Sequence, residues 1–209
     1  MQVTAIVDKY LSARYAFFRW RCSMVLVNKL GLALAMALLT GLCAQIRIYL
    51  PFSPVPITGQ VFAVLLSGVI CGGVFGSFSQ LIYIGLGIAG LPWFAAFSPS
   101  SGPLFASATG GYLIGFAIAP LLIGGYTDRH IAARGFFSQV KLMMLGVGII
   151  YAAGTIVLAT VMRLTLWQAL FQGVVPFIFI DLIKACLAAA LSSAILPRSA
   201  YNGEIDNRQ

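Results

Sequence analysis

Residues 57–90 read ITGQVFAVLLSGVICGGVFGSFSQLIYIGLGIAG, a run without a single charged side chain. The lack of charge extends to both sides, because no Asp, Glu, Lys, Arg or His occurs between Arg47 and Asp128. A transmembrane helix needs about 20 predominantly apolar residues. This part of the chain alone can therefore hold three spans, and the turn at Cys71, Gly72 and Gly73 separates the second from the third.

The composition of the whole chain also indicates a membrane protein. Hydrophobic residues make up 60% and charged residues 9% of the sequence, and the mean hydropathy is +0.97, which leaves too little polar surface for a soluble domain. The net charge of +8 would suit nucleic acid in a soluble protein, but the basic residues lie at the ends of hydrophobic segments. The sequence therefore predicts an all-α integral membrane protein without a nucleic-acid partner, since lipid requires internally satisfied backbone.

Charge, proline and glycine divide the chain into six predicted transmembrane helices, at residues 29–49, 58–74, 76–92, 109–127, 140–161 and 174–196. They form one membrane domain, 29–197, between a basic N-terminal segment, 1–28, and a tail, 198–209. In the basic segment, aromatic and basic residues alternate from Tyr10 to Arg21. This pattern is typical of an interfacial helix on an anionic leaflet, and a mobile basic tail would look the same.

The Lys and Arg residues predict the orientation in the cell membrane. With a cytoplasmic N-terminus, ten of the 13 Lys and Arg residues fall on the cytoplasmic side and two, Arg47 and Arg163, fall outside. Both termini are then cytoplasmic, and the loops 50–57, 93–108 and 164–173 lie outside. These loops could close over a pocket as a lid or act as plain connectors.

Asp181 and Lys184 form the one ionisable pair inside a predicted span. Their i, i+3 spacing puts them on one helical face, within about 5 to 6 Å. Ionisable groups in a membrane are costly and are functional candidates by default. The pair could bind a ligand that carries N–H donors beside an acceptor, such as a ureido ring, but it could also lock neighbouring helices or serve a proton or cation.

Three further groups of residues are candidate sites, and each has a purely structural alternative. Thr109, Gly111 and Tyr112 open the fourth span, where free N–H groups can bind an anion and where glycines can also serve close packing. Trp93, in an outer loop, could stack on a ligand or anchor the interface. Small residues in the first span, including Ala33 and Ala37, allow close approach of another helix, either from a partner or within the bundle.

The chemistry that the sequence lacks narrows the function. It contains no GxxxxGK phosphate loop, so the chain is not expected to hydrolyse ATP. The single His, His130, falls in a loop, and no base accompanies the hydroxyl groups of the spans, which argues against an enzyme. The four Cys form no CxxC pair, so we expect no metal site. Transport or binding is the class that remains.

Five segments resemble the BioY family, the biotin-specific substrate-binding subunits (S components) of energy-coupling-factor (ECF) transporters. They are AQIR (44–47), PFSPVPIT (51–58), GLP (90–92), TGGYLIGF (109–116) and DLIKA (181–185). The sequence departs from the family pattern at residues 178–180 and 97–101, and the resemblance does not cover the segment before Lys29.

This resemblance implies an S-component-like bundle of six helices with a biotin pocket that opens outward, under the outer loops. Asp181 and Lys184 match the family's polar pair. Ala33 and Ala37 match the residues that dock onto the transmembrane coupling subunit, and two separate ATPase subunits would supply energy. An S component for another vitamin, a helix-packing protein without transport activity and a homo-oligomer stay open as alternatives, and no cofactor is expected besides biotin as ligand.

Overall fold

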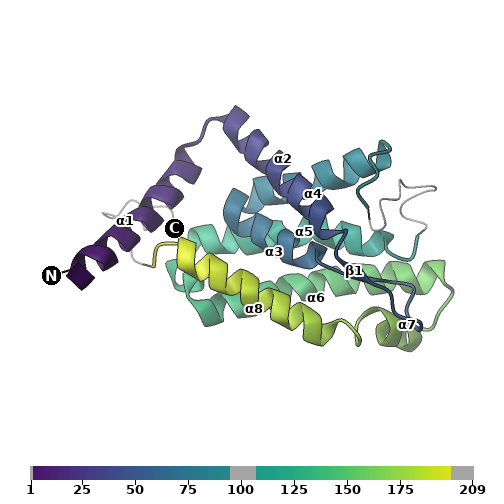
Figure 1. Cartoon of the computed structure of the whole chain (residues 1–209). Helices are drawn as coiled ribbons and strands as arrows, with labels where there is room; N and C mark the ends of the chain where they lie inside the picture. Colours follow the sequence, from purple (N-terminus) through teal and green to yellow (C-terminus); the bar gives the residue numbers. More distant parts are fainter. Residues whose placement is uncertain (1, 95–106, 199–209) are drawn as a thin grey trace.

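The computed structural model describes residues 2–94 and 107–198, and these residues form a helical bundle with a small two-stranded sheet at one end (Figure 1). The helices are α1 (Gln2–Ser23), α2 (Leu26–Cys43), α3 (Gln60–Cys71), α4 (Gly73–Ile88), α5 (Gly110–Arg129), α6 (Phe136–Val161), α7 (Leu166–Gly173) and α8 (Ile178–Ile195). The 3-10 helix η3 (Ile131–Arg134) joins α5 to α6, and the strands are β1 (Arg47–Ile48) and β2 (Ile57–Thr58).

The six predicted spans correspond to α2, α3, α4, α5, α6 and α8. Four of these, α2, α5, α6 and α8, are long and apolar enough to cross a membrane. The other two, α3 and α4, are apolar helices of 12 and 16 residues. The predicted all-α class is confirmed, and the count of six spans agrees with the bundle if the two shorter helices are included.

The structure differs from the prediction in two connections. The first span was expected to reach residue 49, but α2 ends at Cys43, and the chain then forms an antiparallel hairpin that pairs Arg47 with Thr58. The predicted outer loop 164–173 contains α7. Its start is fixed by a capping box, in which Thr165 accepts from the Gln168 backbone and the Gln168 side chain accepts from the Thr165 backbone.

Helix α5 lies at the centre of the bundle and contacts α3, α4 and α6. A side chain on Gly124 of α5 would collide with the backbone of Gly68 and Gly73, so the turn between α3 and α4 packs directly on the α5 backbone. The turn itself requires Gly72, whose φ of 81° lies in the left-handed region. These close approaches explain why glycine punctuates the charge-free stretch.

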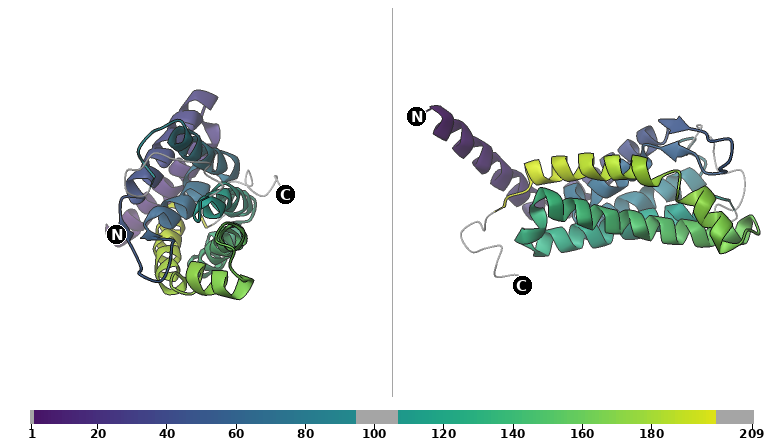
Figure 2. Two further views of the ribbon diagram at one scale, coloured as in Figure 1. Left: turned by 90° about the vertical axis from the view of Figure 1, so that its right-hand side faces the viewer. Right: turned by 90° about the horizontal axis from the view of Figure 1, so that it is seen from below.

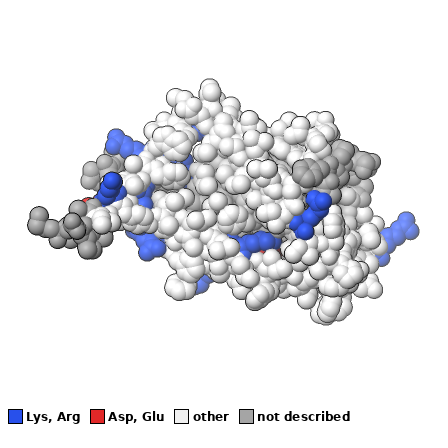
Figure 3. Space-filling model, in the orientation of Figure 1, with Lys and Arg blue, Asp and Glu red and all other residues white. Residues whose placement is uncertain are grey.

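Helix α1 lies at the opposite end of the bundle from the hairpin and α7 (Figures 1 and 2). The Tyr10 hydroxyl donates to the Ala194 carbonyl at 2.7 Å, and the Arg14 guanidinium donates to the Ser193 carbonyl at 2.9 Å, so α1 is fastened to the end of α8. On the face drawn in Figure 3, most of the visible Lys and Arg side chains lie toward this end. We call it the basic end and the other the hairpin end.

Candidate ligand-binding site

The predicted pair in α8 is an ion pair in the structure. The Lys184 Nζ atom lies 2.7 Å from the Asp181 Oδ1 atom. Asp181 is 2% exposed and lies in the first turn of α8, where the helix dipole stabilises a carboxylate. The predicted span began at residue 174, whereas α8 begins at Ile178, so Asp181 lies closer to the helix start than the sequence indicated.

A third group completes this cluster. The Tyr151 hydroxyl, from α6, donates to the Asp181 Oδ2 atom at 2.7 Å. An ionised carboxylate offers about four acceptor positions, and Lys184 and Tyr151 use two of them. Lys184 also retains N–H donors beyond the one that Asp181 accepts. The cluster can therefore accept from one group of a ligand and donate to another.

Tyr112 lies at the start of α5 and connects three helices. Its hydroxyl donates to the Gly173 carbonyl, at the end of α7, at 2.8 Å. A side chain on Gly154 of α6 or on Gly173 would collide with the Tyr112 ring or hydroxyl, so the two glycines make room for it. The structure thus packs Tyr112 against α6, the helix that also carries Tyr151.

The other two predicted residues at this helix start serve local packing. A side chain on Gly111 would collide with the Ala153 carbonyl and Val157 of α6, which is the close-packing alternative that the sequence left open. The Tyr112 N–H donates to the Thr109 carbonyl at 3.1 Å. The Thr109 side chain lies 3.4 Å from the Ser107 hydroxyl. These contacts add no support for an anion site, and the ligand role of Thr109 and Gly111 stays a prediction.

Trp93 is buried between α2 and α4. Its ring lies against Gly41 of α2, its centroid is 5.3 Å from that of Tyr83, and its indole N–H donates to the Tyr83 carbonyl at 3.0 Å. The indole N–H is thus engaged within the protein, and stacking on a ligand stays a prediction. Trp167, in contrast, is 72% exposed, as an interfacial anchor would be.

Ala33 and Ala37, predicted to dock onto a coupling subunit, are both 0% exposed. They lie on the face of α2 that is buried in the bundle, together with Met36 and Thr40. A side chain without exposed surface makes no contact with a second chain in this conformation. This burial favours the alternative of packing within the bundle, and the docking of the two alanines onto a coupling subunit stays a prediction.

The loop 50–57, which was predicted to lie outside, is at the hairpin end. The Ser53 hydroxyl donates to the Gln172 carbonyl of α7 at 2.7 Å, and Val55 and Ile57 are buried in the core. The loop is thus fastened over the end of α7, as a lid would be. Residues 95–106, which hold most of the second predicted outer loop, lie outside the described residues.

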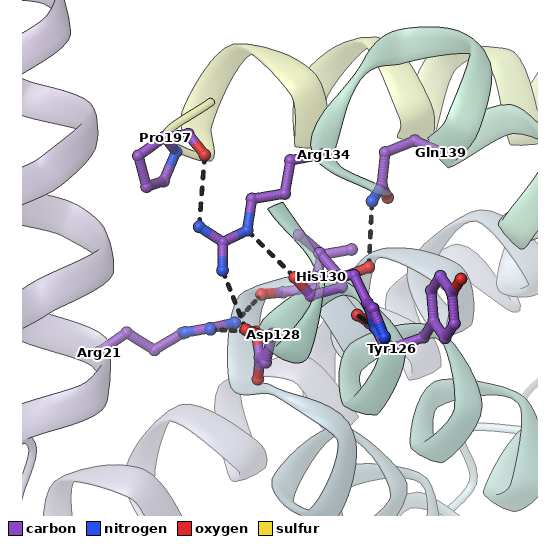
Figure 4. Close-up of polar contacts among 9 residues, drawn as sticks. Arg21, Tyr126, Asp128, His130, Arg134, Gln139 and Pro197 are labelled. Carbon is purple, nitrogen blue, oxygen red and sulfur yellow. Dashed lines mark hydrogen bonds and ion pairs between the residues drawn. The ribbon is translucent and has the colours of Figure 1, made fainter. Parts of the chain in front are cut away.

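A second polar cluster, at the basic end, was not predicted (Figure 4). Arg134 is fully buried, and its guanidinium donates to the carbonyls of Thr127, Asp128 and Pro197. Arg21 of α1 forms an ion pair with Asp128. From the sequence, these arginines were interpreted as topology signals, because Pro197 lies 63 residues from Arg134 and Asp128 lies 107 residues from Arg21, so no local pattern relates them.

Comparison with known proteins relates the sequence to one family of membrane proteins. Residues 14–201 match the model of the BioY family, so the match includes part of the segment before Lys29 that the resemblance did not cover. The chain is 46% identical over 149 residues to a probable biotin transporter BioY of Methanothermobacter thermautotrophicus, covering 68% of this chain and 94% of that protein. It is 37% identical to the biotin transporter BioY of Thermotoga maritima, over 69% of this chain and 83% of the relative.

The fold also has a solved counterpart. The crystal structure of the S component for biotin from an ECF-type ABC transporter superposes with a TM-score of 0.73 and 25% sequence identity. The superposition covers 82% of this chain and 93% of that structure. The expectation of an S-component-like bundle is thereby confirmed.

Proposed function

The chain belongs to the BioY family, and from this membership we propose that it binds biotin in the cell membrane as the S component of an ECF transporter. The two relatives described above are a probable biotin transporter and a biotin transporter, and the similar crystal structure is that of the S component for biotin from an ECF-type ABC transporter. The chain takes up biotin without chemical change to it, and biotin is its ligand rather than a cofactor.

The observation that carries the proposal is the cluster of Asp181, Lys184 and Tyr151. A ureido ring presents N–H donors on either side of a carbonyl acceptor. The free acceptor positions of Asp181 match the ring N–H groups, and the free donors of Lys184 match a carbonyl or a carboxylate oxygen. Because the cluster lies inside an apolar bundle, its hydrogen bonds are stronger than in water.

Energy for uptake would come from other chains. The sequence has no phosphate loop, so the proposed partners are a transmembrane coupling subunit and two ATPases of the ECF module. Helix α1 and the end of α8 lie at the same end of the bundle (Figure 1). Together with the Lys and Arg bias, this supports cytoplasmic termini, a membrane domain at residues 29–197 and an entrance at the hairpin end.

Ligand identification tests the proposal most directly. The protein is solubilised in mild detergent, its retained small molecules are identified by mass spectrometry, and biotin is titrated by calorimetry against lipoic acid, which shares the valerate chain but lacks the ureido ring. We expect biotin to be retained and lipoic acid to bind far more weakly. Retention of another vitamin without biotin binding would instead make the chain an S component of different specificity. A folded protein that binds neither would be a helix-packing protein.

A further inference from the structure

A hollow of about 640 Å³ at the basic end is separate from the cluster around Asp181. It lies between the start of α2, the turn from α3 to α4 and the end of α5, and it falls within the size range of small-molecule sites, about 300 to 1,000 Å³. From its charges and its apolar walls, we propose that this hollow binds the headgroup of an anionic phospholipid.

The charge of the lining favours an anion. Arg21, Lys29 and Arg129 line the hollow, and in the described part of the chain Asp128 is the one carboxylate that does so. Asp128 is already paired with Arg21. Lys29 lies with its Nζ atom 5.6 Å from the centre of the Phe75 ring. Lys29 and Arg129 therefore leave an excess of positive charge over the hollow.

The backbone adds donors on the same side. Helix α4 begins at Gly73, and Gly73, Val74 and Phe75 line the hollow. The N–H groups of a first helical turn have no acceptor within the helix, and the dipole makes this end positive. The His130 ring stacks on that of Tyr126, with 4.1 Å between the ring centroids (Figure 4). His130 also lines the hollow and adds a polar ring to it.

The walls decide which anion fits. Val74 is 68% exposed and Leu121 is 49% exposed, and both line the hollow. An inorganic phosphate would leave this apolar surface uncovered, whereas the acyl chain of a phospholipid would cover it. The position agrees as well, because a lipid headgroup lies at the ends of the spans, where Lys29 and Arg129 are placed. Charge and apolar surface together therefore favour a lipid.

The test compares two double variants of the full chain. Lys29→Gln with Arg129→Gln removes two charges from the hollow, and Arg47→Gln with Arg163→Gln removes two charges at the hairpin end. Each protein is purified in detergent and titrated with phosphatidylglycerol, phosphatidylcholine or inorganic phosphate, and bound lipid is counted by native mass spectrometry. We expect the first variant to bind phosphatidylglycerol at least about tenfold more weakly and the second to bind it like the unaltered protein.

A third variant tests the shape of the site without changing charge. Gly125 lines the hollow, and a Cβ atom there would meet nothing within 4 Å. Gly125→Leu should therefore fill the space and weaken phosphatidylglycerol binding, while the midpoint of thermal unfolding stays close to that of the unaltered protein. Equal losses in both double variants would mean general attraction to anionic lipid and would overturn the proposal. So would unchanged binding in all three, or displacement of the lipid by millimolar inorganic phosphate.

Discussion

Replacement of Asp181 by Asn should weaken biotin binding by roughly ten- to hundredfold. The side chain keeps its size, but one acceptor oxygen becomes an N–H₂ donor. In the structure both oxygens already face donors, Lys184 Nζ on one side and the Tyr151 hydroxyl on the other, each at 2.7 Å. An amide keeps one acceptor oxygen and puts a donor in place of the other, so the cluster loses acceptor positions for the ligand. A hydrogen bond to a charged group contributes about 1.5 to 3 kcal/mol, which corresponds to this range of dissociation constants.

The same change also affects folding, and the two effects must be separated. Asp181→Asn leaves the Lys184 ammonium without its carboxylate in a largely buried position, and breaking a buried pair on one side costs about 3 to 5 kcal/mol. Lys184→Met has the reverse effect on Asp181. The double variant removes both charges, so it should recover much of the stability but none of the biotin affinity.

Isothermal titration with biotin and thermal unfolding would be measured on all three variants in the same detergent. Asp128→Asn is the matched control, because it makes the same substitution in the ion pair with Arg21 at the basic end. It should leave biotin affinity within about twofold of the original. If the double variant is well folded and binds biotin with unchanged affinity, the pair is a helix lock and the proposed site is refuted.

Three other outcomes follow from the packing. Ala37→Leu should lower the free energy of unfolding by about 1 to 3 kcal/mol because the site is buried, whereas Ala35→Leu, exposed on the same helix, should have little effect in a denaturation assay; equal stabilities would return Ala37 to a docking role. Gly154→Val should displace the Tyr112 ring and reduce both stability and biotin affinity, and a variant with native values of both would contradict the described packing. On a cysteine-free background, Ser138→Cys should react with an impermeant thiol reagent in inside-out vesicles and not in intact cells, and the reverse pattern would invert the proposed orientation.

The part of the site that sequence revealed is the part that one helix carries. Asp181 and Lys184 are three residues apart, so helical geometry alone brings them together. Tyr151 comes from α6, and nothing in its local sequence relates it to Asp181. The one sequence signal for Tyr151 was its hydroxyl in a long apolar span, because a buried hydroxyl needs a hydrogen-bond partner. The contacts between distant segments were thus not predicted from the sequence, whereas the contact within one helix was.

The same distinction, between contacts within a helix and contacts between distant segments, explains where the predicted fold was right and where it was wrong. The spans were located because apolar length and glycine positions are local properties. The end of α2 was misplaced, because the pairing of Arg47 with Thr58 is a tertiary contact that overrides the apolar run after Cys43. The capping box at Thr165 and Gln168 follows the T-x-x-Q spacing of the local sequence, so the start of α7 is within reach of sequence-based prediction.

The two hydrogen bonds at the end of α7 have a kinetic consequence. The Ser53 hydroxyl donates to the Gln172 carbonyl, and the Tyr112 hydroxyl donates to the neighbouring Gly173 carbonyl. The loop 50–57 and the start of α5 are therefore hydrogen-bonded to adjacent residues of α7. Gly173 is followed after a short turn by α8 and Asp181. If the hairpin end is the entrance, biotin reaches the polar cluster only when both of these hydrogen bonds break. Association should then be slower than about 10⁵ M⁻¹s⁻¹ and dissociation slow in proportion, so that a modest interaction energy still gives long residence.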